Sequence, residues 1–257
     1  MRKFKRLFFD IETSPNIMFA WTAGFKLNLP PENIIKERAI MCICYKWEGD
    51  RQVHSLEWKN GDDKKLLIDF MKIMNKADEV IGHNSDNFDI KWLRTRCLYH
   101  GIPAIPDYST VDTYKLAKKY FRFNSNKLDY ISSFLGGGHK LHTEFNLWKN
   151  ILLYNDVKAM KKMVTYCKKD VVLQEKVYQK MKQYTNHKTH IGVHGGNDKA
   201  SCPECESENI QKKGIRVTAA GTRFYRLNCQ DCGKWYQIAF SSFNKLIRTK
   251  ENLIKWI

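Results

Sequence analysis

The feature that most constrains this chain is an apolar run near its start that ends in two acidic residues. Residues Phe4 to Ile11 form this run, and Asp10 and Glu12 are two positions apart at its end. Such a run is typical of a buried β-strand, whose period of two places both carboxylates on one face. Because burying two like charges is costly, the pattern indicates a compensating Mg²⁺ or Mn²⁺ ion, which prefers oxygen ligands. The alternative is a solvated strand end.

Two further motifs place acidic side chains beside predicted helices. After a short predicted strand at Glu79 to Gly82, Asn84 and Asp89 lie near the start of a helix. Further along, Tyr166 and Asp170 are four residues apart on a predicted helix, and this spacing places the phenol and the carboxylate on one face. Three motifs of this kind in one order are improbable as a coincidence.

The remaining pattern predicts strands first and helices afterwards. With the first run, two β-rich segments around a Gly49-Asp50 turn give three strands that we expect to be antiparallel. Apolar residues at helical spacing then alternate with one short strand, so the predicted order is β-β-β-α-β-α followed by helices. The predicted segments are strands at Ala39 to Trp47 and Gln52 to Trp58, and helices around Leu66 to Met74, Asn87 to His100, Val111 to Phe121, Lys127 to Leu135 and Asn155 to Met181.

The three motifs Asp-x-Glu-Thr, Asn-x-x-x-Phe-Asp and Tyr-x-x-x-Asp, in this order, resemble those of the DEDD exonucleases of ribonuclease H-like fold, in the DEDDy subtype. The resemblance covers about Phe4 to Tyr184. It looks closest to the proofreading domains of family B DNA polymerases and to stand-alone, often phage-encoded, relatives. It implies an α/β fold with a ribonuclease H-like mixed sheet, in which three antiparallel strands precede parallel strands and helices flank the sheet.

The resemblance also implies an activity, the metal-dependent removal of nucleotides from the 3′ end of single-stranded DNA. By resemblance, Asp10, Glu12, Asp89 and Asp170 hold two Mg²⁺ or Mn²⁺ ions, which activate a water and stabilise the leaving 3′ oxygen. Tyr166 would position that water, since a phenol is too weak an acid to serve as a base near neutral pH. We therefore expect these five residues to be catalytic.

Four residues are expected to contact the substrate. By resemblance, Thr13 and Asn84 contact the terminal nucleotide. Relatives commonly have Ser or Thr immediately before the leucine that matches Leu128, whereas this chain has Lys127. Either Leu128 wedges against a base while Lys127 meets a phosphate, or both residues cap and pack a helix.

A glycine-rich segment, Gly136-Gly137-Gly138-His139-Lys140, follows this predicted helix. It could bring Lys140 to the scissile phosphate. The preferred interpretation is a plain helix stop, because glycine readily adopts the left-handed conformation that ends helices.

Four cysteines near the end of the chain form two CxxC pairs, Cys202 with Cys205 and Cys229 with Cys232. Four thiolates suit one tetrahedral, structural Zn²⁺ ion, and Gly233 fits the tight turn that brings backbone amides toward the sulfurs. Two disulfides are the alternative, but the scattered remaining cysteines favour a reducing compartment. The pattern predicts a closed zinc ribbon of short β-strands.

Composition divides the chain into two domains. Residues 188–200 are rich in Gly, His, Asn and Asp without periodicity, so they are predicted to be a linker. It separates a ribonuclease H-like exonuclease domain at 1–187 from a zinc ribbon at 201–257. The ribbon ends in an expected amphipathic helix over Phe243 to Ile257, with Leu246, Ile247, Leu253, Ile254 and Trp256 as its apolar positions.

A formal net charge of +17 indicates a polyanionic partner, and nucleic acid is the first candidate. Basic and aromatic residues are interleaved around the ribbon and suit single-strand binding, although about half of the aromatics are expected to form its core. Because the sequence has no apolar run of about 18 residues and no signal-peptide core, we expect a soluble protein of the reducing cytoplasm of a bacterial or phage-infected cell. The resemblance leaves room for a replication or repair protein as a further partner.

Two other functions compete with a DNA exonuclease. The same fold and metals cleave RNA, and nothing in the motifs detects a 2′-hydroxyl, so a 3′→5′ exoribonuclease is one alternative. The other is a nucleic-acid-binding adaptor with a vestigial nuclease site. The presence of Asp10, Glu12, Asp89, Asp170 and Tyr166 argues against the adaptor.

Overall fold

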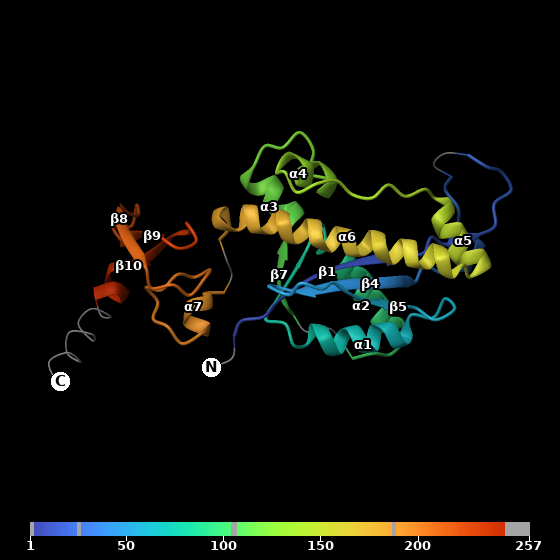
Figure 1. Ribbon diagram of the computed structural model, residues 1–257, viewed down its shortest axis with the longest axis horizontal. Helices are drawn as coiled ribbons and strands as arrows, with labels where there is room; N and C mark the ends of the chain where they lie inside the picture. Colours follow the sequence, from blue (N-terminus) through green and yellow to red (C-terminus); the bar gives the residue numbers. More distant parts are fainter. Residues whose placement is uncertain (1–2, 25–26, 104–106, 187–188, 245–257) are drawn as a thin grey trace. The chain divides into compact units, whose positions relative to one another are not determined.

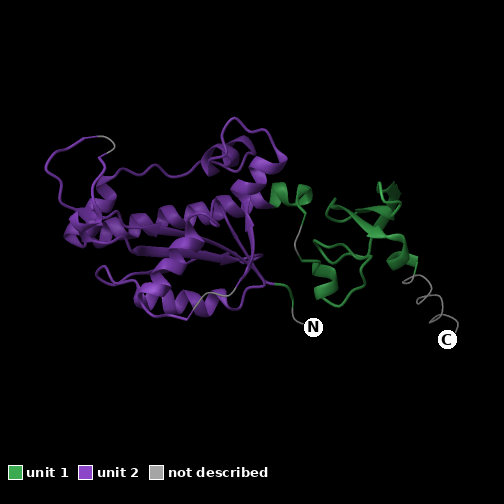
Figure 2. Cartoon of the chain, turned by 180° about the vertical axis from the view of Figure 1, so that it is seen from behind, with its two compact units in different colours: residues 1–4, 179–257 green, residues 5–178 purple. Residues whose placement is uncertain are grey.

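The computed structural model describes residues 3–24, 27–103, 107–186 and 189–244, and the chain forms two compact units (Figures 1 and 2). The larger unit is Lys5–Tyr178, and the smaller unit combines Met1–Phe4 with Gln179–Ile257. The apolar positions of the predicted amphipathic tail, from Leu246 onward, lie outside the described residues. Among the described residues, no helix combines the length and apolar character needed to cross a membrane.

A five-stranded mixed sheet forms the centre of the larger unit and confirms the predicted fold class. Its strand order is β5-β4-β1-β6-β7. The first three strands of this sheet, β1, β4 and β5, pair antiparallel, as predicted, while β6 and β7 continue the sheet in parallel with β1. The strands are β1 (Arg6–Thr13), β4 (Ile40–Trp47), β5 (His54–Glu57), β6 (Glu79–Gly82) and β7 (Ser109–Asp112).

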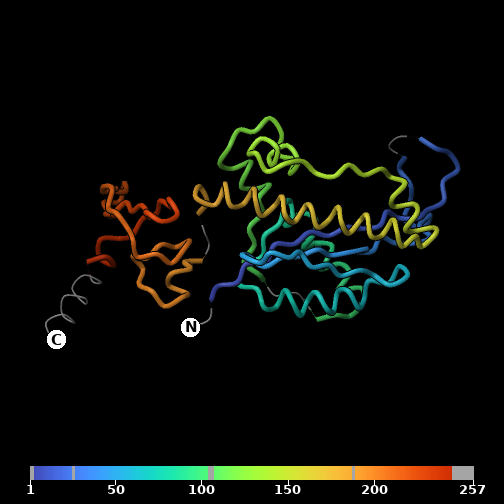
Figure 3. Tube along the Cα trace, viewed as in Figure 1, coloured from blue at the N-terminus to red at the C-terminus, as the bar shows by residue number. Residues whose placement is uncertain are grey.

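Helices cover both faces of this sheet, as the ribbon and the chain trace show (Figures 1 and 3). Helix α6 lies along one face, and α1 and α2 cover the other. A separate apolar cluster fills the interface between the sheet and the helices on each face. The helices of the larger unit are α1 (Lys64–Met74), α2 (Asp89–Tyr99), α3 (Thr113–Tyr120), α4 (Leu128–Phe134), α5 (Asn146–Tyr154) and α6 (Val157–Met181, whose last residues belong to the smaller unit). A two-stranded ribbon pairs β2 (Ile17–Met18) with β3 (Ile34–Lys36), and a short 3-10 turn, Pro31–Asn33, directly precedes β3.

The predicted elements differ from the structure most clearly at β7 and α5, and the ribbon of β2 and β3 was not predicted. Strand β7 occupies the start of a segment predicted to be helical, and α3 begins only at Thr113. The side chain of Asp112 accepts hydrogen bonds from the backbone amides of Tyr114 and Lys115, so it is the N-cap that separates strand from helix. Helix α5 was not predicted, although Asn155 ends it in the left-handed conformation, with φ at 48°.

The alternation of side chains along β1 directs its carboxylates toward α6. Leu7, Phe9 and Ile11 are buried in the cluster shared with α1 and α2, whereas Phe8 belongs to the cluster shared with α6. Asp10 and Glu12 have the same parity as Phe8, so a strand with a period of two presents them to α6. The sheet thus brings the first motif to the helix that carries the third.

Asp156 immediately precedes helix α6 and caps it, because its carboxylate accepts hydrogen bonds from the backbone amides of Lys158 and Ala159. The helix then buries a stripe that includes Met160, Met163 and Cys167 against the sheet. Such i, i+3, i+4, i+7 spacing is what an amphipathic helix needs to cover a sheet face. Asp170 continues this stripe, so the helix turns a carboxylate into its own buried face.

The smaller unit contains an antiparallel sheet with the order β10-β9-β8. Its strands are β8 (Ile210–Val217), β9 (Arg223–Cys229) and β10 (Trp235–Ala239). A short 3-10 turn, Lys182–Tyr184, and helix α7 (Ile191–His194) precede the sheet. Helix α7 lies within the segment expected to be a linker, and the units divide earlier, between Tyr178 and Gln179. The buried Ile191 donates its amide to Pro203 O at 3.0 Å, so this part of the segment packs within the smaller unit.

A buried ionic network ties α1, α2 and β4 together. Asp63, at the start of α1, is fully buried and accepts two 2.8 Å hydrogen bonds from the Arg96 guanidinium. It also accepts from the Ile40 amide at 2.9 Å and contacts His100 Nε2 at 2.6 Å. Burial would raise the pKa of Asp63, but these hydrogen bonds lower it overall, so the residue stays ionised.

We expect Asp63→Asn to lower the free energy of unfolding by about 3 to 5 kcal/mol, because it leaves the buried Arg96 guanidinium without its carboxylate. Urea denaturation followed by circular dichroism measures the change. The matched control is Asp50→Asn, at an exposed carboxylate in the turn after β4, which should change stability by less than about 0.5 kcal/mol. Equal effects of the two substitutions would show that the network contributes little.

Candidate active site and paired-cysteine site

The four predicted carboxylates come from three elements and meet at the end of β1. Asp10 and Glu12 lie on β1, Asp89 begins α2, and Asp170 lies on α6. A carboxylate oxygen of Asp10, one of Glu12 and the Cys167 sulfur lie within 4.8 Å of one another. Asp89 Oδ1 accepts a hydrogen bond from the Ile11 amide at 3.1 Å, which fixes α2 against the strand between the two β1 carboxylates.

Burial and mutual repulsion act together on these groups. Burial is the main cause that raises the pKa of Asp10 well above its ordinary value, and Asp89, Glu12 and Asp170 raise it further. Burial likewise raises the pKa of Glu12 to about 8 and of Asp89 to about 7, and it raises the pKa of Asp170. A site with such shifts demands a cation if all four groups are to ionise near neutral pH.

Lys140 enters this site from the glycine-rich loop. Its Nζ lies 2.5 Å from Asp170 Oδ2 and donates to the Tyr166 hydroxyl at 3.4 Å, while its backbone amide donates to Asp129 Oδ1 at 2.6 Å. Although burial lowers the pKa of Lys140, the neighbouring charge of Asp170 raises it overall, so the ammonium stays charged. The preferred sequence interpretation, a plain helix stop, was therefore incomplete: Gly136, with φ at +72°, follows α4, and the same loop delivers Lys140 to the carboxylates.

Tyr166 lies one helical turn before Asp170 and is partly buried. Burial is the main cause that raises the pKa of Tyr166 to about 12, and the negative charge of Asp170 adds to it. The phenol therefore stays protonated at neutral pH. It can donate a hydrogen bond but has little capacity to take up a proton.

Sequence reasoning missed two α6 residues that hold Asp10. Gln174 Nε2 donates to Asp10 Oδ1 at 3.3 Å. The Cys167 thiol lies 3.4 Å from Asp10 O and 3.6 Å from Asp10 Oδ2. Helical spacing could have identified both residues, because Cys167, three residues before Asp170, and Gln174, four residues after it, lie on the same face of the helix as Asp170.

The residues of this site fit divalent cations. Within the described chain, Asp170 Oδ1 is buried and has no hydrogen-bond partner, which is unusual for a carboxylate oxygen. The donors converging here are mainly carboxylate oxygens, the ligand type that Mg²⁺ and Mn²⁺ prefer. Asp10, Glu12, Asp89 and Asp170 are the residues that would hold such ions.

The loop after β6 places Asn84 next to the site in a strained conformation. Asn84 has φ at 61°, a left-handed value that Asn tolerates better than most residues. Its amide donates to Asp112 Oδ1 at 2.8 Å. His83 contacts Thr113 Oγ1 at 2.9 Å and Asn126 O at 3.0 Å, and burial lowers the pKa of this histidine to about 4, so it bridges as a neutral ring.

The other predicted substrate contacts differ in accessibility. Thr13 ends β1, where its carbonyl oxygen accepts a hydrogen bond from Trp148 Nε1 at 3.2 Å, and Lys127 is exposed immediately before α4. Leu128 is only 4% exposed. Its burial favours the helix-packing alternative for Leu128 over a wedge against a base.

A groove with a volume of about 820 Å³ opens beside Tyr166. One wall is a face of α6 that carries Lys158, Lys161 and Lys162, and the other is the segment after Lys140, from Leu141 to Leu147. The three lysines outnumber the two acidic residues that also line the groove, Glu144 and Asp156, so the groove is electropositive on balance. The groove therefore suits a chain of phosphates that leads to Tyr166.

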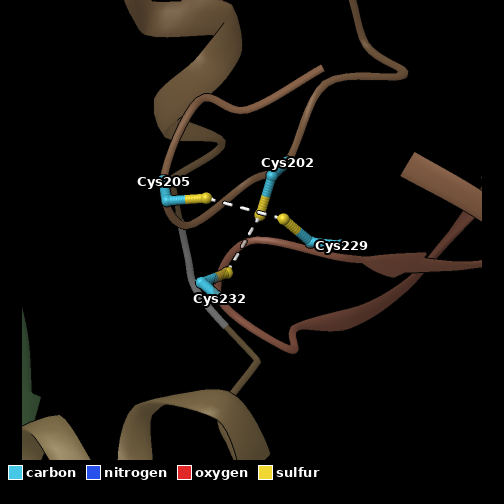
Figure 4. Close-up of side chains that lie close together, drawn as sticks. All are labelled: Cys202, Cys205, Cys229 and Cys232. Carbon is cyan, nitrogen blue, oxygen red and sulfur yellow. Dashed lines mark hydrogen bonds between the residues drawn. The ribbon is translucent and has the colours of Figure 1, made fainter. Parts of the chain in front are cut away.

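The paired cysteines converge in the smaller unit, as Figure 4 shows. One ligand sulfur from each of Cys202, Cys205, Cys229 and Cys232 lies within 4.8 Å of the others. The sulfurs of Cys202 and Cys232, and those of Cys205 and Cys229, are 3.6 Å apart. Four sulfurs around one Zn²⁺ lie about 3.8 Å apart, whereas a disulfide needs about 2.0 Å.

The surroundings of the four sulfurs also fit zinc, and all eight cysteines of the chain are free thiols. Gly233 has φ at +75° and donates its amide to Cys229 O at 3.0 Å, as the predicted tight turn requires. Burial raises the pKa of Cys205 to about 12, so its thiolate needs a cation nearby. The cluster is compatible with one Zn²⁺ ion.

The chain matches a family model described as RNase_H superfamily over residues 35–182. It is similar to a DNA polymerase of Archaeoglobus fulgidus, with 26% identity over an alignment of 131 residues that covers 44% of this chain and 16% of that protein. It is also similar to the solved structure of the family B DNA polymerase from the hyperthermophilic archaeon Pyrobaculum calidifontis, with a TM-score of 0.55 and 16% identity over 75% of this chain and 26% of that one. At that identity the structural similarity shows the fold alone. The chain thus spans a minor part of each polymerase.

We expect Cys229→Ser to weaken zinc binding by at least about a hundredfold, because a hydroxyl replaces one thiolate ligand. Native mass spectrometry should find one Zn²⁺ per wild-type chain and little or none in the variant. Cys97→Ser, which removes a buried thiol of α2, should keep the zinc. A folded wild-type β8–β10 sheet that contains no metal would contradict the assignment.

Proposed function

The chain belongs to the RNase H superfamily, and from this premise we propose that it is a metal-dependent 3′→5′ exonuclease that removes nucleotides from single-stranded DNA. The family match supports a nucleic-acid hydrolase in general. The observation that carries the finer proposal is the meeting of Asp10, Glu12, Asp89 and Asp170 beside Tyr166, in the order and spacing of a DEDDy site. The family match begins at residue 35, so it does not include the two β1 carboxylates.

Two Mg²⁺ or Mn²⁺ ions held by these four carboxylates would activate the attacking water and stabilise the charge on the leaving 3′ oxygen. The protein contributes a rigid frame for them. Asp89 is fixed by the Ile11 amide, and Asp10 by Gln174 and Cys167. Such outer contacts keep ligands in a set orientation, which supports metal binding at a defined place.

Tyr166 acts in this proposal by orientation. Since its raised pKa keeps the phenol protonated, it donates a hydrogen bond to the attacking water and aligns it with the phosphorus. Its own oxygen accepts from Lys140, which fixes the direction in which the hydroxyl proton points. Tyr166 is thus a positioning group with a defined donor role.

Lys140 adds a mobile positive charge on the substrate side of the site. Its ammonium balances Asp170 in this structure, and its loop also forms one end of the groove wall. From this position the ammonium can neutralise part of the charge of a phosphate that enters beside Asp170.

The groove along α6 gives the strand a path to the site. Lys158, Lys161 and Lys162 lie on one helical face that ends near Tyr166, so phosphates upstream of the terminal nucleotide can follow it. Backbone contacts of this kind read no sequence. An enzyme that removes any terminal nucleotide needs such sequence-independent contacts.

The choice of DNA rests on the relatives, which are named as DNA polymerases. The described site residues include no group that is evidently placed to read a 2′-hydroxyl, so a 3′→5′ exoribonuclease remains the second candidate. A non-catalytic adaptor is disfavoured because four carboxylates, Tyr166 and Lys140 converge in one place. A replication or repair protein that recruits the enzyme is compatible with this proposal.

We expect the wild-type protein to shorten 5′-labelled single-stranded DNA from its 3′ end in Mg²⁺, giving a ladder on a sequencing gel. Asp10→Asn keeps the side-chain shape but removes a metal ligand, and should slow hydrolysis at least about a thousandfold. Asp50→Asn, in an exposed turn, is the control and should cleave normally. A matched RNA decides between the two nuclease candidates, and binding without any ladder would favour the adaptor.

We expect Lys140→Gln to reduce kcat by about 10- to 100-fold with little change in KM, because the ammonium acts beside the reacting phosphate. Single-turnover hydrolysis measures the chemical step directly. Lys72→Gln removes an exposed lysine of α1, on the other face of the sheet, and should leave the rate unchanged. An unchanged rate for Lys140→Gln would mean that Lys140 only ends the loop.

A further inference from the structure

The sheet of the smaller unit has one face that its own core does not use. Tyr225, Leu227 and Ile238 share the inner face, where Leu227 and Ile238 are buried and Tyr225 stacks on Phe240 at 3.9 Å between ring centroids. Since successive strand residues alternate between faces, Phe224 and the other residues of opposite parity lie on the outer face. The buried side chains Leu227 and Ile238 thus lie on the inner face, whereas Phe224 on the outer face is half-buried.

The outer face carries an aromatic ring flanked by guanidinium groups. Trp235, on β10, is 50% exposed, and the Arg226 guanidinium lies 5.9 Å from its ring centroid. Arg216 Nη1, on the edge strand β8, reaches across to Gln237 Oε1 at 3.3 Å. We call this surface the outer sheet face, made of Arg216, Phe224, Arg226, Asn228, Trp235 and Gln237.

The charge of the sheet is of one sign. Strands β8, β9 and β10 contain no acidic residue, while β8 and β9 together contribute Lys212, Lys213, Arg216, Arg223 and Arg226. The acidic residues of this region, such as Glu204 and Asp231, lie in the cysteine-bearing loops. The sheet is thus complementary to a polyanion.

The combination of groups narrows the class of polyanion. Arginine fits phosphate by its planar fork and also stacks on rings, and an exposed tryptophan offers a surface on which an unpaired base can stack. Amide side chains such as Asn228 and Gln237 can bond to base edges or sugars. A duplex hides its base faces, so a stacking platform between arginines suits a single strand.

We propose that the outer sheet face is a second binding site for single-stranded nucleic acid, separate from the cleavage site, with Trp235 as the stacking platform and Arg216 and Arg226 as phosphate contacts. This deepens the proposed function, on which it rests for the identity of the strand. It assigns a task to the smaller unit beyond holding a metal. The site holds the strand without regard to sequence.

The test uses the full-length, zinc-loaded chain carrying Asp10→Asn, without added Mg²⁺, and a fluorescent oligothymidylate of about 30 nucleotides. Fluorescence anisotropy measures Kd between about 50 and 200 mM salt. Trp235→Ala should weaken binding about 5- to 100-fold, and Trp235→Phe should recover part of the loss. Arg216→Gln with Arg226→Gln should lower the magnitude of the log Kd against log salt slope by about 1.4.

The matched control is Arg223→Gln. Arg223 is on β9 with Arg226 but, three residues away, it has the parity of the inner face. It should change binding and the salt slope much less than Arg226→Gln. Zinc content and circular dichroism show whether each variant is folded, and Trp235→Phe keeps the test valid should Trp235→Ala not fold.

Three outcomes would overturn the proposal. They are unchanged Kd for both Trp235 variants, equal losses from Arg223→Gln and Arg226→Gln, and self-association of the wild type that Trp235→Ala abolishes, which would make the face a protein interface. The binding assay needs no hydrolysis. If the protein binds the strand through Trp235 but never cleaves it, the exonuclease proposal fails and this binding site stands. If the protein cleaves but its binding does not depend on Trp235, the exonuclease proposal stands and this binding site fails.

Discussion

Four carboxylates at one end of β1, two of them buried and two half-buried, are the constraint on which the larger unit depends. Their mutual repulsion in a space of low dielectric opposes folding, so packing elsewhere must offset it. The apolar side chains of β1 provide this stabilising packing on the opposite face of the sheet, where Phe9 and Ile11 pack against α1 and α2. Because that face is rigid, the carboxylates cannot separate to relieve their repulsion. The site is therefore held ready for a cation before one binds.

Lys140 shows how the chain manages this charge with its own residues. An ammonium on Asp170 partly neutralises the cluster, yet Lys140 comes from a loop, whereas the carboxylates come from the sheet and the helices. A loop residue can change partners at low cost, since only its own side chain must move. Its backbone stays anchored through the amide bond to Asp129. A permanent cation placed on α6 would compete with metal ions at all times.

The parts that followed from the sequence are those where one local pattern decides the structure. The alternation along the β1 run predicted which side chains lie on each face of that strand. The spacing along α6 predicted that Tyr166 and Asp170 lie on one face of that helix. Their catalytic roles stay predictions. Strand β7 was missed because four residues are too few to separate a period of 2 from 3.6, and Lys140 because its position depends on where the loop after α4 leads. Gln174 was missed since its partner, Asp10, is distant in sequence.

The functions that we propose for the two units make opposite physical demands. Hydrolysis of a phosphodiester needs groups held within fractions of an ångström, which burial and rigid packing provide. Holding a strand of any sequence needs contacts that tolerate different bases, which exposed rings and flexible cations provide. A sheet as small as β8–β10 suits the second task, because four thiols and a few inner side chains stabilise it and leave Trp235 and the arginines outside the core. With the Zn²⁺ ion that we propose for the four thiols, the stability of this sheet would depend on the metal more than on apolar area, and its outer surface would be free to bind a strand.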